Sequence, residues 1–432
     1  MTDERPAHAY RQGVGIALAA AACAPAVLVR LTGSHPPAWA AALVFGIGVV
    51  GAAFMLSWAA EVVQLDISAG LALALLALIA VLPEYAVDFV FTWKAGKNPA
   101  VSSYALANMT GGNQLLIGVG WSFVVLVATW RIGRVLATSS STDLHGSTAS
   151  EVVLERSHSV EIAFLAAATV YGLTLPLRRT LSLFDAAVLV SLFVGYLVRI
   201  SGAPAEEPHL VGPAQLIGTL TPRRRRQVVT VLFVAAAAVI LACAEPFAES
   251  LVSTGKEFGI DEFLLVKWLA PLASEAPELL VAGMYAWRLN TNSALGALVS
   301  SKVNQWTLLV GTLPIVFAFS SGALHGLPVD AMQREELFVT AAQSAFAVAI
   351  LASRSISVRE AQTLLTLFVV QLVLGGVLHE GLRDDVRIVV GAIYLALGLL
   401  VVIRDIRSVP RMFRDGFRTP YAELAEDVAV PA

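Results

Sequence analysis

The sequence is poor in charged residues and in cysteine. Only 14% of its 432 residues are charged, whereas soluble proteins carry about 25%, and 57% are hydrophobic. The two cysteines, Cys23 and Cys243, are too few for a disulfide framework or a cysteine metal cluster, and we expect both to be small buried residues. These shortages exclude a soluble globular domain and a disulfide-stabilised secreted protein, and they indicate an integral membrane protein.

Motifs of several functional classes are also missing. The chain has no Gly-x-x-x-x-Gly-Lys-Ser/Thr loop for ATP and no Asp-rich calcium loop of the EF-hand kind. His379-Glu380 lacks the second histidine of a zinc protease motif. The arginine run at residues 223–226 is interpreted as a topology determinant rather than a nucleic-acid patch. We therefore expect neither an enzyme nor a nucleic-acid-binding protein.

Long apolar runs divide the chain into about twelve candidate membrane spans, most of them near the 20 or so residues that cross a bilayer. The first run follows Arg11, as in a signal peptide, but it lacks a good cleavage site, so we interpret it as a retained helix. The sequence therefore predicts an all-α, polytopic protein of the lipid bilayer. The spans lie near residues 13–31, 38–60, 68–93, 101–130, 159–175, 180–200, 227–252, 260–287, 293–319, 335–353, 358–379 and 386–404.

Basic residues are distributed unevenly between the predicted loops. When the arginine run at residues 223–226 is placed in the cytoplasm, twelve spans bring both termini to the same side. About twice as many basic residues then lie inside as outside, which is the usual asymmetry of membrane proteins. This distribution predicts a multi-pass plasma-membrane protein with both termini in the cytoplasm.

The spans also form two matching sets of five, one before and one after the arginine run. An odd number of helices in each half inverts the second half relative to the first, which is the inverted-repeat plan of secondary transporters. About two further helices lie outside the repeat. The predicted parts are an N-terminal tail and extra helix (1–37), a first half (38–200), a basic cytoplasmic loop (201–226), a second half (227–379), and an extra helix with a cytoplasmic tail (380–432).

One short motif occurs once in each half. The tripeptides LPE (82–84) and APE (276–278) place an acid directly after a proline within an apolar span. The small-residue stretches GGN (111–113) and SSK (300–302) follow them. We expect each proline to break its helix and free carbonyl oxygens, and an acid at membrane depth, which costs roughly 2.5–3.5 kcal/mol, indicates function. The alternative is a kinked helix whose acid is salt-bridged or faces water.

These paired segments, over about residues 38–379, resemble the two alpha repeats of the sodium/calcium exchanger family. In that family, Gly-Thr-Ser-x-Pro-Glu is followed by Gly-Ser-Asn or Gly-Ser-Asp in each half. The resemblance implies that Glu84 and Glu278 are the central cation-binding carboxylates and metal ligands, with Asn113 as a further ligand. It also implies transport of inorganic cations, namely sodium, potassium, protons or calcium, without a cofactor. Hard cations take oxygen ligands of these kinds.

The chain departs from the family motif beside both prolines. Ala80 and Val81 stand where the family has threonine and serine, which removes hydroxyl ligands expected of sodium sites. In the second copy the corresponding residues are Ser274 and Glu275, and Glu275 adds an acid as a candidate cation ligand. The sequence therefore predicts a site richer in carboxylates and poorer in hydroxyls than the family pattern.

Lys302 is the departure with the largest chemical effect. It replaces the asparagine of the second small-residue motif when GGN (111–113) is aligned with SSK (300–302), whereas a rival alignment pairs Asn113 with Asn304. Its ammonium group can pair with the acids, repel a doubly charged ion, and release a proton when a cation arrives. Snorkelling to the interface or a structural salt bridge is the alternative.

Polar residues in or beside the motifs are candidates for an ion path, although an interhelical hydrogen bond explains the amides equally well. We predict a secondary active cation antiporter that exchanges a monovalent cation for protons by alternating access, with Lys302 as the coupling residue. The alternatives are a calcium exchanger driven by sodium or protons and a non-transporting sensor or scaffold. The path residues are Asp88, one helical turn after Glu84, and Asn108, Ser274, Ser301, Asn304 and Gln305.

Overall fold

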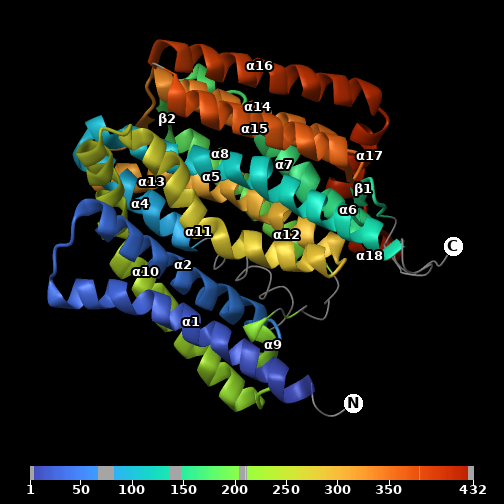
Figure 1. Ribbon diagram of the computed structural model, residues 1–432. Coiled ribbons are helices and arrows are strands. Elements are labelled where there is room, and N and C mark those ends of the chain that lie inside the picture. Colours follow the sequence, from blue (N-terminus) through green and yellow to red (C-terminus); the bar gives the residue numbers. More distant parts are fainter. Residues whose placement is uncertain are drawn as a thin grey trace. The chain divides into compact units, whose positions relative to one another are not determined.

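The computed structural model describes residues 4–66, 82–136, 147–203, 210, 212–378 and 380–426, and most of them are helical (Figure 1). The predicted all-α membrane fold is confirmed. Nine helical segments of this described part are long and apolar enough to cross a membrane: Gly13–Thr32, Ala38–Val63, Pro99–Leu136, Arg156–Leu177, Leu183–Ile200, Pro222–Phe258, Thr291–Ser321, Val358–Val377 and Gly381–Arg404.

Three of the twelve predicted spans are not among these nine. The span at 68–93 falls partly on residues 67–81, which lie outside the described residues, and its second part is in α4 (Leu82–Lys97). The spans at 260–287 and 335–353 correspond to α11 (Glu262–Trp287) and α14 (Ala331–Leu351). Both are helices of sufficient length, but charged residues in both, and amides in α14, lower their hydropathy.

The chain forms two compact units, and each unit draws on both predicted halves. The first unit comprises Met1–Phe91 and Ala203–Glu278, and the second comprises Thr92–Gly202 and Leu279–Ala432. Two helices, α4 and α11, continue from one unit into the other. These are the helices that carry the two proline-glutamate motifs.

Small residues set the packing of the first unit. A Cβ atom on Gly48 of α2 would lie 2.7 Å from the Cβ of Ala26 in α1, so the two helices approach more closely than larger side chains would permit. The free cysteines Cys23 and Cys243 are buried, as predicted, and the Cys23 thiol donates to the carbonyl oxygen of Gly48 at 3.5 Å. The helices of this unit, besides parts of α4 and α11, are α1 (Glu4–Thr32), α2 (Ala38–Val63), α9 (Pro213–Gly218) and α10 (Pro222–Phe258).

The arginine run lies in the first turn of α10 and binds the chain just after α2. Arg225 donates two hydrogen bonds to Asp66, at 2.8 Å from Nε and 2.9 Å from Nη2, and Arg226 adds a third at 3.1 Å. At its other end α10 stops at Gly259, whose φ of 63° is a left-handed conformation that favours glycine. The predicted topology determinant therefore also holds two segments of the unit together.

The second unit contains the remaining elements. Two short antiparallel strand pairs join distant parts of it, β1 (Glu151–Val153) with β4 (Ser355–Ser357) and β2 (Thr180–Leu181) with β3 (Leu327–Pro328). Its helices, besides α14 and parts of α4 and α11, are η1 (Pro99–Val101), α5 (Ser102–Leu115), η2 (Leu116–Trp121), α6 (Ser122–Leu136), η3 (Arg156–His158), α7 (Ser159–Gly172), η4 (Leu175–Leu177), α8 (Leu183–Ile200), α12 (Thr291–Asn304), η5 (Gln305–Leu309), α13 (Val310–Ser321), α15 (Val358–Val377), α16 (Glu380–Arg404), α17 (Ser408–Phe417) and α18 (Tyr421–Glu426).

Capping boxes begin three helices of this unit. In each box a side chain accepts from the main-chain N–H three residues later, and the residue there accepts from the cap in return, which satisfies groups that the first helical turn leaves without partners. The boxes explain why α8, α14 and α15 begin where they do. They are formed by Ser182 with Asp185, Asp330 with Gln333, and Ser357 with Glu360.

Candidate functional site

The helices that carry the two small-residue motifs have the same construction. α5 and α12 are each 14 residues long, and each continues directly into a π-helical segment, η2 or η5. Asn113 is the twelfth residue of α5, and Lys302 is the twelfth residue of α12. The structure therefore gives Lys302, rather than Asn304, the position of Asn113. π-Helical turns of this kind are frequent at functional sites.

Lys302 and Asn113 contact each other within the second unit. The ammonium nitrogen of Lys302 donates to Oδ1 of Asn113 at 2.5 Å and to its carbonyl oxygen at 3.1 Å. It also lies 4.9 Å from the centre of the Trp306 ring, within range of a cation–π interaction. The lysine is 0% exposed, so the snorkelling interpretation is wrong. Two oxygens and an aromatic face replace part of the water that the ammonium group loses on burial.

A second hydrogen bond orients the Asn113 amide. Its Nδ2 group donates to the carbonyl oxygen of Met109 at 2.9 Å, which leaves Oδ1 to accept from Lys302. An amide has two donor hydrogens and one acceptor oxygen, so these partners determine which atom faces the lysine. Asn113 thus presents its oxygen to an ammonium group of the chain itself, and its role as a ligand of a transported cation stays a prediction.

The predicted carboxylates lie in the first unit. Glu84 is 3% exposed, Asp88 and Glu275 are also buried, and Glu278 is partly exposed. Glu84 and Asp88 are four residues apart in α4 and therefore share one face of the helix, as the sequence predicts. Acids buried in this way are costly unless they are compensated, which marks them as candidates for binding cations or protons.

The helix break predicted at Pro277 is wrong, because α11 runs through both Pro271 and Pro277. Proline nevertheless has no N–H group, so the carbonyl of Ala273 loses the main-chain donor of a regular helix. Ser274 donates to the carbonyl oxygens of Ala270 at 3.3 Å and Pro271 at 3.2 Å. The second motif can therefore offer the carbonyl oxygen of Ala273 to a cation although the helix is not broken. Residues 67–81, which lead into the first motif, lie outside the described residues.

The remaining predicted path residues are in the second unit. Asn108, Asn304 and Gln305 are buried, and Ser301 is partly exposed. Among the residues that the structure describes, no group of three or more His, Cys, Asp or Glu side chains is arranged to hold a metal ion.

The sequence analysis missed a buried polar cluster around Gln114, the residue after Asn113. Gln114 donates through Nε2 to Thr340 at 2.7 Å and to Glu336 at 3.3 Å, and its Oε1 accepts from Gln371 at 2.9 Å. Gln343 donates to its main-chain oxygen at 3.3 Å. The signal was present in the sequence, because residues 336, 340 and 343 follow helical spacing within a stretch interpreted only as apolar.

Proteins of known structure share this fold, and one of them also has substantial sequence identity. A family model described as sodium/calcium exchanger protein matches residues 37–202 and 228–375. A solved structure described as the H+/Ca2+ exchanger CAX is 42% identical, with a TM-score of 0.86, over 94% of this chain and 98% of that chain. The Ca2+/H+ antiporter protein YfkE is 16% identical, with a TM-score of 0.62, over 84% of this chain and 99% of that chain, and it shows the fold alone. A comparison with curated proteins found no match.

Proposed function

Because the chain belongs to the sodium/calcium exchanger family, and is therefore a membrane cation antiporter rather than an enzyme, we propose that it exchanges calcium for protons. The observation that carries the proposal is the contact between Lys302 and Asn113. An ammonium group takes both oxygens of Asn113. It stands where the family pattern has a neutral amide.

The proposed counter-ion follows from the neutral oxygen ligands of the family motif that this chain has lost. Lys302 removes one amide and engages the oxygens of another, and Ala80 and Val81 replace two hydroxyl-bearing residues. Sodium depends on neutral oxygens of these kinds in the family motif, whereas calcium and protons both bind to carboxylates. The substitutions therefore disfavour sodium and favour protons as the counter-ion.

Glu84 and Glu278 are the proposed carriers of both ions. A carboxyl group that has taken up a proton is a poor ligand for calcium, so protonation releases calcium and loss of the protons permits calcium to bind. The burial of Glu84 sharpens this competition, because an ionised carboxylate away from water needs a cation or a proton. The relative that is 42% identical is described as an H+/Ca2+ exchanger, which supports this choice of ions.

The exchange of a monovalent cation for protons, the prediction of the sequence analysis, is a second candidate. The observation that favours it is the buried charge of Lys302. Coulomb repulsion from an ammonium group is twice as large for a doubly charged ion as for a singly charged ion at the same distance. Proton movement coupled to sodium or potassium, and absent with calcium, would support this candidate over the first.

Flux measurements in proteoliposomes test the proposal. An acidic interior should drive calcium uptake while the internal pH rises. We expect Glu84→Gln and Glu278→Gln to abolish both signals, because an amide neither carries a proton nor supplies a charged ligand. Glu257→Gln is the matched control, since Glu257 is an exposed acid near the end of α10, and this variant should behave like the wild type.

Two results would contradict the proposal. Calcium uptake driven by a sodium gradient, without proton movement, would assign the protein to sodium/calcium exchange. A well-folded protein that moves no calcium, sodium, potassium or protons would instead support the non-transporting sensor or scaffold.

A further inference from the structure

A buried carboxyl group lies in the second unit, outside both proline-glutamate motifs. Glu336 of α14 is 3% exposed, in a helix that packs against α5, α7, α15 and α16. An acid buried within a membrane protein is expensive and usually functional. The proposed exchange reaction, as described so far, gives this one no role.

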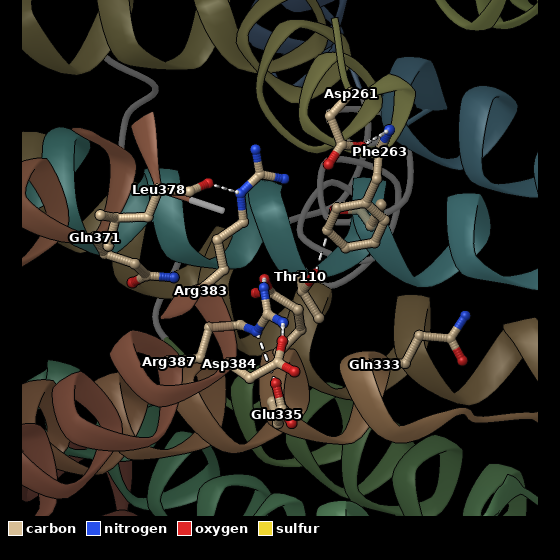
Figure 2. Close-up of polar contacts among 12 residues, drawn as sticks. Thr110, Asp261, Phe263, Gln333, Glu335, Gln371, Leu378, Arg383, Asp384 and Arg387 are labelled. Carbon is tan, nitrogen blue, oxygen red and sulfur yellow. Dashed lines mark hydrogen bonds and ion pairs between the residues drawn. The ribbon is translucent and has the colours of Figure 1, made fainter. Parts of the chain in front are cut away.

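Arg387 of α16 forms an ion-pair cluster with Asp384 and Glu335 (Figure 2). Glu336 lies beside this cluster, on what we call its outer side. Arg387 donates from Nε to Glu335 at 2.9 Å and from Nη2 to Asp384, whose side chain is 51% exposed. Its Nη1 lies 3.8 Å from Oε1 of Glu336, which is longer than a hydrogen bond. Arg387 therefore provides positive charge near Glu336 while it makes its short contacts with the other two acids. The cluster connects the buried carboxyl group to solvent.

The inner side of Glu336 faces the residue that follows Asn113. Its Oε2 accepts from the Nε2 group of Gln114 at 3.3 Å. The oxygens of Asn113 in turn bind Lys302. Within the second unit, neighbouring polar groups thus lead from the exposed carboxylate of Asp384 to the buried ammonium group. Arg387 and Glu336 are 3.8 Å apart in this series, and the chain itself joins Gln114 to Asn113.

Buried amide atoms without partners occur on α14 and α15. Oε1 of Gln343, Oε1 of Gln371 and Nε2 of Gln333 are buried and have no hydrogen-bond partner among the described residues. Gln343 and Gln371 both donate to Gln114 through Nε2, so the two unpartnered oxygens belong to side chains that contact Gln114. Buried polar atoms are nearly always satisfied, and a water with two to four such partners is the usual means.

The helices hold these groups in a line. α14 and α16 run parallel, because Glu335 meets Arg387 and, eleven residues further along each helix, Phe346 meets Gly398. From Glu335 to Gln343 is eight residues of α14, or about 12 Å at the helical rise of 1.5 Å per residue. This stretch of α14 therefore covers roughly two fifths of a hydrocarbon core that is about 30 Å thick.

The charged surroundings of Glu336 differ between its two sides. α5 and α15 present the neutral amides of Gln114 and Gln371, while η2 and η4 carry no titratable residue. A proton on Glu336 thus meets charged groups on the outer side and neutral amides on the inner side. The titratable and charged groups at this end of the elements packed against α14 are Arg334 and Glu335 on α14, Arg383, Asp384, Asp385, Arg387 and Tyr394 on α16, and Tyr171 on α7, whose hydroxyl donates to Asp185.

We propose that Glu336 relays protons between the Arg387 end of the second unit and the Asn113–Lys302 pair, through water bound by Gln343 and Gln371. The inference rests on the proposed proton coupling. In one direction, the carboxylate takes a proton from hydronium on the Arg387 side, which forms a carboxyl O–H bond and leaves water. That bond then breaks toward a water on the Gln343 side, which becomes hydronium, and the carboxylate is restored. Nothing is consumed, and one proton has passed.

Two calcium fluxes measured on Glu336→Gln test the relay. Uptake driven by a proton gradient requires proton passage, whereas exchange of labelled for unlabelled calcium at equal pH moves no net protons. We expect the first flux to fall by roughly a hundredfold, the low end of what a positioned proton carrier contributes, and the second to be unchanged. Glu336→Asp keeps a carboxyl group and should restore proton-driven uptake. Asp385→Asn, an exposed acid beside the cluster, is the matched control and should change neither flux.

The possible failures are distinguishable. Full proton-driven uptake in Glu336→Gln would overturn the relay. An equal loss of both calcium fluxes that Glu336→Asp does not repair would also overturn it, because that result would indicate a structural role for Glu336. Wild-type protein that exchanges calcium without moving protons would overturn the proposed function itself, and the relay with it.

Discussion

Lys302 donates hydrogen bonds to both oxygens of Asn113, and the two residues occupy the same position in two helices of equal length. Equivalent residues of the predicted halves therefore meet as donor and acceptor. An amide at both positions would leave oxygens for a mobile cation, whereas the lysine supplies a tethered one. We regard this substitution as the main chemical difference between the chain and its family pattern.

Lys302→Asn should open a place for sodium. The substitution restores the family amide and removes the tethered positive charge, so sodium gains neutral oxygen ligands. We expect external sodium to compete with calcium uptake in this variant and to have little effect on the wild type. Lys256→Asn, an exposed lysine in α10, is the control. An identical sodium response in all three proteins would contradict the role assigned to Lys302.

Asn113→Leu should destabilise the protein by roughly 1.5–3 kcal/mol, the usual contribution of a hydrogen bond to a charged group. The cause is a buried ammonium group that has lost its side-chain acceptor, Oδ1, and keeps only the main-chain oxygen of residue 113. The double variant Asn113→Leu/Lys302→Met removes that charge, and we expect it to recover much of the loss. Thermal unfolding in detergent measures the effect, and purely additive losses would show that the two residues do not interact.

Gly118→Ala should disturb the π-helical segment η2. A Cβ atom there would lie 2.5 Å from Cγ of Phe368 in α15, so the helices must separate, at a cost of about 1–3 kcal/mol. Gly133→Ala in α6 is the matched control, because its nearest neighbour, the Cβ of Ala149, is an ordinary contact at 3.5 Å. We expect a lower unfolding temperature for the first variant alone. Equal temperatures would mean that η2 is not tightly packed.

Acid should release the C-terminal helices α17 and α18. Hydrogen bonds from Arg156, at 2.9 and 3.2 Å, and then from Thr419 hold the pKa of Asp415 below its ordinary value of 3.8. A carboxyl group whose pKa is lowered on folding stabilises the fold above its ordinary pKa, and this contribution is lost as the pH falls through the lowered pKa. Hydrogen exchange of residues 408–426 should rise in that acidic range.

Asp415→Asn provides the control for this acid effect. It removes the titrating group, so protection of residues 408–426 should be reduced already at neutral pH and should show no comparable step in acid. A step of wild-type size in the variant would assign the acid sensitivity to another group.

The predicted orientation is testable because both native cysteines are buried. We expect Arg224→Cys, an exposed position in the arginine run, to react with an impermeant thiol reagent only from the cytoplasmic side. Lys256→Cys, near the opposite end of α10, should react only from outside. The reverse pattern would invert the topology, and reaction of the unmodified protein would show that Cys23 or Cys243 is accessible.

The sequence was most informative where a local property decides structure. Long apolar runs become helices in a membrane, so most of the expected spans correspond to helices. Local reasoning was wrong at Pro277, because a proline removes one hydrogen bond and the rest of a 26-residue helix can continue around it. It also undervalued α14, where polar residues at helical spacing were interpreted only as part of an apolar span.

The site was less predictable because its contacts join distant residues. The sequence identified Asn113 and Lys302 as equivalents, and it predicted that the lysine pairs with an acid. The structure brings the lysine to Asn113, which is 189 residues away, and pairing with Glu84, Glu275 or Glu278 stays a prediction. The partners of Gln114 are more distant still, at separations of 222 to 257 residues. No local pattern specifies such pairs.

The parallel packing of α16 against α14 has a consequence for how the protein can be shortened. The family pattern ends at residue 375, before α16 begins. A chain trimmed to that pattern would retain both motif copies and lose Arg387, which pairs with Glu335, and Tyr394, whose hydroxyl accepts from Gln343. A chain that ends at residue 375 would therefore still match the family but would lack part of its buried polar network. Deletion studies should keep α16, although this helix lies outside the repeat.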